Sequence, residues 1–237
     1  MNTNNLSPII LIVYNRVEHT KTVIDALLLN SLASDSILYI YSDSSKCIAD
    51  EEGVIKVREY INNIKGFKKI IIKLREHNYG LANNMVSSVT EVINKHGVAI
   101  ILEDDDVPSK YFLDYMNTAL IKYKNNKKVM SITGYMFPVS SNGLQQTVFG
   151  RLSASWGWAT WSRAWKYFDH DRNAPNEPEA LWFQKWIDPL GVNSKTSGVD
   201  RKNFTYPVTG TFERYFFDVG NIRFLMMSDV NEKSQKK

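Results

Sequence analysis

The chain has 237 residues, of which 43% are hydrophobic, 23% charged and 12% aromatic. This length and composition suit a globular protein with its own hydrophobic core, and they exclude a disordered or fibrous chain. Lys and Arg exceed Asp and Glu by 29 − 25 = 4 residues, which is too small an excess for a dedicated nucleic-acid binder, so no nucleic-acid partner is expected.

Short runs rich in β-branched residues are predicted as strands. They occupy residues 8–14, 36–41, 69–74, 98–102 and 129–133. Their nearly continuous hydrophobicity is typical of strands that are buried on both faces, as in a parallel sheet.

The segments between these runs have helical spacing of apolar residues. Helices are predicted over 20–29, from Asp50 as N-cap to about 64, over 81–95 with Gly97 as the C-terminal left-handed residue, and over 109–123 with Ser109 as cap. Strand and helix thus alternate four times. This alternation predicts the α/β class, with a mostly parallel central sheet flanked by helices.

The pattern changes after residue 135. The segment 150–168 is dense in tryptophan, and the rest of the chain is predicted to be loop-rich. We therefore expect a single domain over 1–237, with a regular half at about 7–135 and an irregular half at about 136–237.

Two further features bear on localisation and redox chemistry. The first residues lack a basic segment followed by an apolar one, so no signal peptide is expected. The apolar run 9–14 is far too short to span a bilayer. Cys47 is the single cysteine, which excludes disulfides within the chain and cysteine-rich metal sites. A cytoplasmic protein is expected.

Four consecutive carboxylates, residues 103–106, follow directly after a predicted buried strand. Such charges repel one another strongly in a partly dry cleft unless a cation compensates them. A hard divalent ion such as Mn²⁺ or Mg²⁺ meets this need, since it prefers oxygen ligands. The alternative is a solvated acidic turn that caps the next helix. The position at the end of a buried strand favours the metal.

Other polar residues follow the remaining strands, at the edge of a parallel sheet where ligands bind. They include Asn15, Arg16, Asp43, Arg75 and Asn78. Each of these residues has a simpler interpretation as a turn residue or a solvated side chain. The tryptophans of the segment 150–168 are either core residues or a stacking surface for a sugar ring. Motifs of dinucleotide dehydrogenases, P-loop enzymes, α/β-hydrolases and zinc proteases are absent.

Taken in order, several segments resemble the GT-A glycosyltransferases of the family 2 type. These are PIILIVYNRVEHTKTVIDAL, YSDSSK, REHNYGLANN, AIILEDDDVPSKYFLDYM, SITGYMF and WGWATWSRAW. The EDD variant of the DxD motif is also similar to that of N-acetylglucosaminyltransferase I. The resemblance covers about residues 7–170 and implies a GT-A fold, a nucleotide-diphospho-sugar donor, Mn²⁺ or Mg²⁺, and transfer to an acceptor hydroxyl.

The resemblance also implies roles for individual residues. Donor-binding positions are Asn15, Arg16, Asp43, Arg75, Asn78, Gly80, Leu81, Glu103, Asp104, Trp156, Gly157 and Trp158. The metal ligand is Asp105, or Asp106 if the motif is shifted by one residue.

The catalytic base of such enzymes lies beyond the tryptophan segment, where this chain departs from the pattern. The candidates are Asp169, Asp171, Asp188, Glu213 and Asp218. Either the C-terminal part is divergent or the chain is truncated, and both alternatives stay open.

The resemblance thus predicts a metal-dependent, inverting glycosyltransferase of the hexosyl- or N-acetylhexosaminyltransferase class. It would use a UDP-linked sugar and a glycan or lipid-linked acceptor in polysaccharide biosynthesis, with peripheral contact at the inner face of the membrane. One alternative is a non-catalytic nucleotide-sugar or glycan-binding module on the same fold. A sugar-phosphate nucleotidylyltransferase is a weaker alternative, since the glycine-rich loop it needs is replaced by YNRVEHT.

Overall fold

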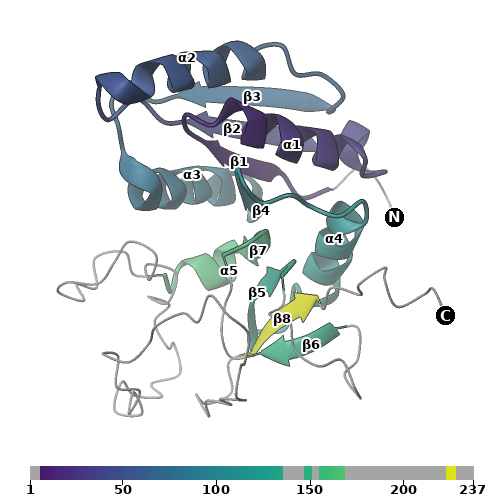
Figure 1. Cartoon of the computed structure of the whole chain (residues 1–237). Helices are drawn as coiled ribbons and strands as arrows, with labels where there is room; N and C mark the ends of the chain where they lie inside the picture. The colour runs from purple at the N-terminus through teal and green to yellow at the C-terminus, as the bar shows by residue number, and fades with distance from the viewer. Residues whose placement is uncertain (1–5, 136–146, 151–154, 169–222, 228–237) are drawn as a thin grey trace, which may run out of the picture.

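The computed structural model describes residues 6–135, 147–150, 155–168 and 223–227 (Figure 1). The strands are β1 (Ile9–Val13), β2 (Ile37–Ser42), β3 (Lys69–Leu74), β4 (Val98–Glu103), β5 (Val129–Thr133), β6 (Thr147–Gly150), β7 (Trp158–Trp161) and β8 (Arg223–Met227). The helices are α1 (Val17–Leu28), the short 3-10 helix η2 (Ala33–Asp35), α2 (Ile48–Ile61), α3 (Gly80–His96), α4 (Phe112–Lys122) and α5 (Ser162–Trp165).

The described strands form one sheet in the order β3-β2-β1-β4-β7-β5-β8-β6. Strands β3, β2, β1 and β4 pair in parallel, as the alternation of strands and helices predicts. Strand β7 enters between β4 and β5 and runs antiparallel to both, so the second half of the chain contributes to the same sheet. The α/β architecture with a mostly parallel sheet and flanking helices is confirmed.

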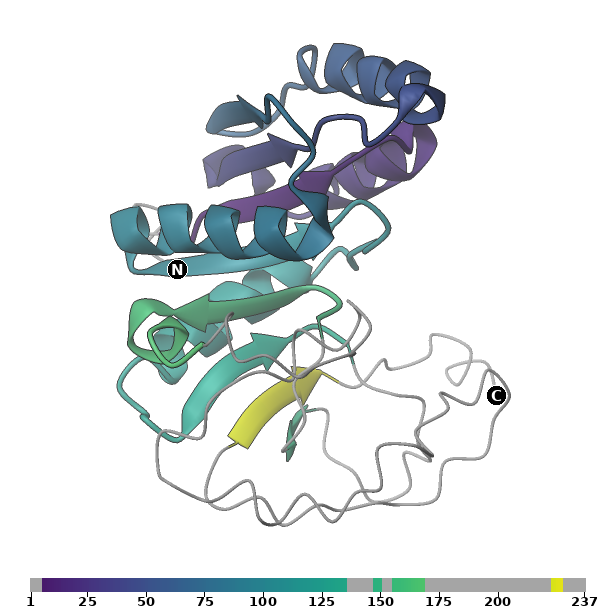
Figure 2. The ribbon, with the colours of Figure 1, turned by 90° about the vertical axis from the view of Figure 1, so that its left-hand side faces the viewer.

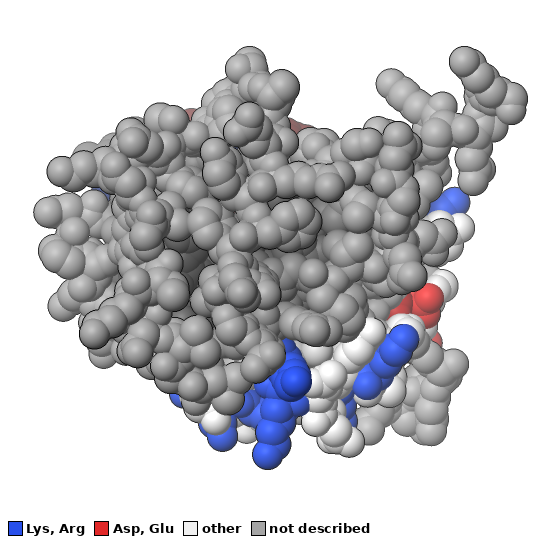
Figure 3. All heavy atoms as spheres, turned by 90° about the horizontal axis from the view of Figure 1, so that it is seen from below, with Lys and Arg blue, Asp and Glu red and all other residues white. Residues whose placement is uncertain are grey.

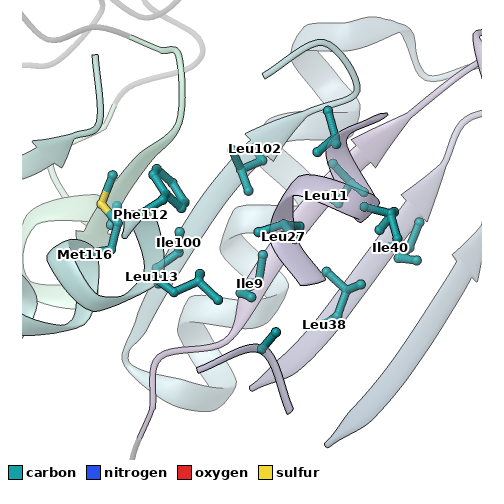
Figure 4. Close-up of a cluster of buried hydrophobic side chains, with 14 of the residues drawn as sticks. Ile9, Leu11, Leu27, Leu38, Ile40, Ile100, Leu102, Phe112, Leu113 and Met116 are labelled. Atoms are coloured by element: carbon teal, nitrogen blue, oxygen red, sulfur yellow. The ribbon is translucent and has the colours of Figure 1, made fainter. Parts of the chain in front are cut away.

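Helices cover both faces of the sheet and divide the core into two layers. On one face α1, α2 and α4 pack against the strands, with Leu27, Phe112 and Met116 contributing to this layer (Figure 4). On the other face α3 and α5 pack, with Met85 and Trp165 among the buried residues (Figure 2). The central strands are therefore buried on both faces, and β1 and β5 are buried along their whole length.

The structure corrects three local predictions. Strand β3 is an edge strand whose residues are half-buried or exposed, so it is not buried on both faces. Helix α2 begins after Cys47, and Asp50 lies in its first turn instead of capping it. Helix α4 begins after Tyr111 with no side-chain cap, so Ser109 is not its N-cap. The prediction for the end of α3 is confirmed, since Gly97 has a φ of 77° there.

None of the helices in the described ranges is long and apolar enough to cross a membrane. Figure 3 shows the molecule from below. The described atoms visible on that face belong mainly to Lys, Arg and uncharged residues, with a small area of Asp and Glu. Lys and Arg thus form most of the charged area among the described atoms visible in that view.

Candidate functional site

The carboxyl ends of β2, β1 and β4 lie side by side at one edge of the sheet. In the ladder Val13 is opposite Ser42, and Ile12 is opposite Glu103. The segments that follow these strands therefore share an edge, as the sequence predicts. The segment after β2 and the acidic run after β4 are two strand spacings apart, which is about 10 Å.

Asp43 is the centre of one part of this edge, which we call the Asp43 turn (residues 42–44 with Asn78 and Tyr79). Its side chain is buried, and Oδ1 accepts hydrogen bonds from the backbone N–H groups of Ser44 and Tyr79, both at 2.9 Å. Asn78 Nδ2 donates to the Ser44 carbonyl at 2.6 Å and approaches Asp43 Oδ2 at 3.4 Å. The carboxylate thus joins the ends of β2 and β3 without a cationic partner among these contacts.

Two arginines support this turn from inside the fold. Arg58 of α2 donates from Nη2 to the carbonyl oxygens of Asp43 and Arg75 at 3.3 and 2.9 Å. Arg75 donates to Asn84 Oδ1 at 2.9 Å and stacks on the Tyr79 ring, 4.5 Å from its centroid. These contacts position the turn, and the donor-binding role of Arg75 stays a prediction.

Other expected donor-binding residues occupy the same edge. Asn15 Nδ2 donates to Asp50 Oδ1 at 2.9 Å, which ties the end of β1 to α2. Gly80, with a φ of 70°, begins α3, and the side chain of Leu81 beside it is exposed. The spacing of apolar residues predicts Leu81 on the buried face of α3, but in the structure its side chain is exposed.

The four carboxylates of the acidic run, which we call the acidic strand end (residues 103–106), point in different directions. Asp104 is buried and forms a close ion pair through Oδ1 with Arg16 Nη2, while Arg16 Nε lies 3.4 Å from Oδ2. Asp105 is 49% exposed and lies 3.1 Å from Arg16 Nη1. The charge compensation that the sequence requires is supplied here by Arg16.

Burial perturbs the titration of this group. It raises the pKa of Glu103 to about 8, and the charges of Asp106, Asp105 and Asp104 act in the same direction. Burial also raises the pKa of Asp104, although the Arg16 hydrogen bond lowers it in part. Contact with Asp104 raises the pKa of Arg16, so this guanidinium stays charged. Burial and the neighbouring carboxylates therefore favour the protonated form of Glu103, and protonation reduces the repulsion within the run.

Asp106 turns back into the fold. Its Oδ2 accepts hydrogen bonds from the backbone N–H of Glu103 at 3.1 Å and of Gly157 at 2.9 Å. Burial raises its pKa to about 6, against the lowering effect of these two hydrogen bonds. Gly157 in turn accepts a hydrogen bond from the Gly134 N–H at 2.6 Å. Asp106 therefore connects the acidic strand end to the tryptophan segment and to the end of β5.

A cavity of about 280 Å³ opens beside the acidic strand end. Its lining includes Asp105, Asp106, Ser109, Phe112, Tyr135 and Trp156. The Trp156 side chain is 44% exposed and packs edge-on against Tyr135, with 4.6 Å between the ring centroids. The cavity thus combines two carboxylates, a hydroxyl and aromatic faces, which is the composition of a small polar ligand site.

The tryptophans of residues 156–165 do not act alike. Trp158 lies in β7 with 0% exposure, inside the core layer beneath α3, and its ring does not reach the cavity. Trp161 and Trp165 are buried as well. We therefore correct the expected donor-binding role of the Trp158 side chain to a core role. Trp156 is the tryptophan of this segment that a ligand can reach.

The described residues fit a divalent metal that has one protein carboxylate as ligand, with substrate phosphates and water as the others. Within the ranges that the structure covers, no three Asp, Glu, His or Cys side chains are placed to hold a metal ion. Mg²⁺ and Mn²⁺ in phosphoryl sites use one or two carboxylates, with substrate phosphates and water completing the shell. Asp105 suits this arrangement, because its carboxylate is exposed at the cavity. Asp106 suits it less, because one carboxylate oxygen accepts two backbone hydrogen bonds.

The five candidate bases, Asp169, Asp171, Asp188, Glu213 and Asp218, lie outside the described residues. The sequence interpretation also missed two kinds of residue. Tyr135 and Phe112 line the cavity, and the signal for Tyr135 was its place directly after β5 at the same edge of the sheet. Arg58 gave no signal in the sequence, because its partners are backbone carbonyls that only the fold brings near it.

Comparison with known proteins gives a likeness of fold. No family model and no curated protein matches the chain. Among solved structures it is similar to the mannosyltransferase PcManGT from Pyrobaculum calidifontis in complex with GDP-Man and Mn²⁺. The two chains share 11% sequence identity, and the TM-score is 0.46. The match covers 67% of this chain and 46% of that chain. It is also similar to TarS 1–349 of S. aureus, with 12% identity, 65% and 47% covered, and a TM-score of 0.44.

A further similar structure is glucosyl-3-phosphoglycerate synthase from Mycobacterium tuberculosis in complex with Mn²⁺, UDP and glucosyl-3-phosphoglycerate. It shares 11% identity, with 68% of this chain and 58% of that chain covered and a TM-score of 0.40. The chain spans about half of the length of these structures. Likeness at this level does not assign a family or an activity, so function is argued from the residues.

Proposed function

We propose that the protein is a metal-dependent glycosyltransferase that moves a sugar from a nucleotide-diphospho-sugar to an acceptor hydroxyl. The observation that carries the proposal is the exposed Asp105 carboxylate, placed between the Asp43 turn and the aromatic cavity. The ordered motifs of the first 170 residues support it through their resemblance to GT-A glycosyltransferases. We propose a UDP-linked donor and an inverting reaction.

The spacing of the edge supports a nucleoside diphosphate as ligand. The Asp43 turn would hold the nucleoside, with the exposed Leu81 side chain packing against it. The acidic strand end lies two strands away, about 10 Å along the edge, where the diphosphate would lie. The sugar would then enter the cavity beyond it, against Trp156 and Tyr135.

Asp105 would hold the metal together with the donor diphosphate and water. When bound, the metal would supply charge stabilisation to the departing nucleoside diphosphate. Arg16 contacts Asp104 and Asp105, so its guanidinium would provide a second positive charge next to the proposed diphosphate position.

In the proposed reaction the acceptor oxygen forms a bond to the anomeric carbon as the bond from that carbon to the diphosphate oxygen breaks. The proton of the acceptor hydroxyl passes to a base, and the electron pair of the broken bond leaves with the nucleoside diphosphate. We propose the base among the five carboxylates in residues 169–218. The half-buried Asp106 is a poor alternative, since it accepts two backbone hydrogen bonds.

The test replaces Asp105 by Ala and measures UDP binding by calorimetry with and without Mn²⁺. We expect the Mn²⁺-dependent part of the affinity to fall by at least about tenfold, because the exposed carboxylate is the proposed protein ligand. Asp114→Ala is the matched control, since Asp114 is an exposed carboxylate in the first turn of α4. Unchanged Mn²⁺-dependent UDP binding in Asp105→Ala would show that the metal assignment is wrong.

A nucleotide-sugar-binding module without turnover is the second candidate. Among the described residues the carboxylates that line the cavity are Asp105 and Asp106, and both already have proposed tasks. Incubation with a panel of nucleotide-sugars and Mn²⁺ separates the two functions. Hydrolysis or transfer of a donor supports the enzyme, and saturable binding without either supports the module.

The acceptor and location are also proposals. We propose a glycan or lipid-linked acceptor in polysaccharide biosynthesis, handled in the cytoplasm with peripheral contact at the membrane. The net charge of +4 and the Lys and Arg side chains visible in Figure 3 support contact with anionic lipid. Cosedimentation with vesicles containing an anionic lipid, compared with neutral vesicles, tests this contact.

A further inference from the structure

We propose that Arg16 exchanges partners during donor binding. In the free protein its guanidinium forms ion pairs with both Asp104 and Asp105. On binding of the donor it keeps Asp104, releases Asp105 to a divalent cation and turns Nη1 to a phosphate oxygen of the donor. This inference rests on the proposed function and adds a specific task for one side chain of the same site.

The geometry gives Arg16 two different contacts. Nη2 and Nε both face Asp104, which makes a forked contact with a buried carboxylate. Nη1 faces Asp105 Oδ2 at 3.1 Å, and both of these side chains are nearly half exposed, at 44% and 49%. A single guanidinium therefore holds one buried and one exposed carboxylate at the same time.

The two contacts differ in how readily they break. Removing the partner of a buried carboxylate is costly because the charge stays desolvated, so the contact with Asp104 should persist. An exposed ion pair contributes little, since water and salt screen it. The contact with Asp105 is therefore the one that a competing cation can replace. Nη1 then has donor capacity for a phosphate oxygen, while Nη2 and Nε keep the side chain anchored.

Partner exchange has a signature that a fixed structural ion pair lacks. If Arg16 competes with the cation for Asp105, loss of its charge strengthens the binding of the cation alone. If Arg16 also contacts the diphosphate, the same loss weakens the binding of UDP. A residue that only supports the fold changes both affinities in the same direction when it is replaced.

The experiment compares Arg16→Gln with the wild type in two titrations. Binding of Mn²⁺ alone is followed by electron paramagnetic resonance of free Mn²⁺, and binding of UDP is followed by calorimetry at saturating Mn²⁺. We expect Mn²⁺ to bind about threefold or more tightly and UDP about tenfold or more weakly. Lys21→Gln is the matched control, because Lys21 is a similarly exposed cation of α1 that is paired with Glu18. It should change neither affinity.

Arg16→Lys covers the case in which Arg16→Gln does not fold. A lysine ammonium lacks the planar fork and cannot serve both carboxylates with the same geometry. We expect Arg16→Lys to fold, to bind Mn²⁺ more tightly than the wild type and to bind UDP more weakly. Equal or weaker Mn²⁺ binding by the folded Arg16 variants would overturn the inference.

Asp105→Ala separates failure of this inference from failure of the proposed function. If wild type binds Mn²⁺, Asp105→Ala does not, and the Arg16 variants bind it no more tightly, the inference alone is wrong. If neither wild type nor the Arg16 variants bind Mn²⁺, with or without UDP, the metal site is wrong and the inference fails with it.

Discussion

The Asp43 turn and the acidic strand end place carboxylates at the ends of β2 and β4, on either side of β1, yet the two regions stabilise them differently. Asp43 accepts two backbone N–H groups and lies next to an amide, so neutral donors hold it. Asp104 and Asp105 depend on the Arg16 charge, and burial keeps the pKa of Glu103 near 8. Directional hydrogen bonds fix the first region, whereas charge balance holds the second.

This difference teaches which part of the edge should respond to a ligand. A carboxylate held by short backbone hydrogen bonds has little reason to move when a nucleoside arrives. A charge-balanced group responds to any new cation or anion, because the interactions are long-ranged and depend on the local dielectric. We therefore expect the Asp43 turn to be preformed and the acidic strand end to reorganise.

The largest expected effect comes from Asp43→Ala. The substitution leaves the N–H groups of Ser44 and Tyr79 without their carboxylate acceptor, which should cost about 2–4 kcal/mol of unfolding free energy. Urea denaturation followed by circular dichroism measures this loss. Asp43→Asn keeps an acceptor oxygen and should lose clearly less. Equal losses in both variants would mean that charge, not the hydrogen bonds, holds the turn.

A smaller effect is expected for Asp106→Ala, which removes the acceptor for the Glu103 and Gly157 N–H groups. The expected loss is about 1–3 kcal/mol. Asp106→Asn, which keeps one acceptor oxygen, should lose less than about 1 kcal/mol. Thermal unfolding in EDTA compares the three proteins.

The Asp106→Asn variant also decides whether Asp105 or Asp106 is the metal ligand. If Asp105 holds the metal, Asp106→Asn binds Mn²⁺ with the affinity of the wild type. A tenfold or greater loss of Mn²⁺ affinity in Asp106→Asn would instead favour the motif shifted by one residue.

Strands β1 to β5 and the site edge were predictable from the sequence for physical reasons, whereas β6, β7 and β8 lie in the half that the sequence predicts to be irregular. Runs of β-branched residues such as Val129–Thr133 favour a strand, and the structure has a strand with those bounds that is buried along its whole length. The starts of the helices were less predictable. Asp50 has the chemistry of an N-cap, but Tyr14 and Asn15 hydrogen-bond to its carboxylate from another element. Long-range contacts thus outweigh the local capping preference.

The position of the site residues was predictable, whereas their individual tasks were not. Parallel strands bring their carboxyl ends together, so residues 43 and 103–106 had to share an edge. What each carboxylate does depends on partners far away in the sequence. Arg16 reaches Asp104 across 88 residues, and Gly157 reaches Asp106 across 51. No local pattern encodes these pairs, so the resemblance could assign Glu103 and Asp104 to the donor and Asp105 to the metal, but not name Arg16 or Gly157 as their partners.

Substitution of one glycine in each region by alanine compares how tightly the two regions are packed around the backbone. Gly157, at the acidic side, has a φ of 58°, and a Cβ there would lie 3.0 Å from Phe112 Cε2. Gly80, on the side of the Asp43 turn, has a φ of 70°, and a Cβ there would meet nothing within 4 Å. Both substitutions by Ala carry a left-handed backbone cost of about 1 kcal/mol. Gly157→Ala should lose about 1 kcal/mol more, since its Cβ overpacks against the aromatic ring.

Urea denaturation of the two Ala variants measures this difference. The emission of Trp156, obtained as the difference between each protein and its Trp156→Phe counterpart because the chain has six tryptophans, reports on the cavity. We expect the emission of Gly157→Ala to shift and that of Gly80→Ala to stay unchanged, because Trp156 adjoins Gly157 in the lining of the cavity. Equal stability losses in the two variants would mean that the Phe112 ring gives way without cost. The wall of the cavity at Phe112 could then adjust its shape to a ligand, in contrast to the preformed Asp43 turn.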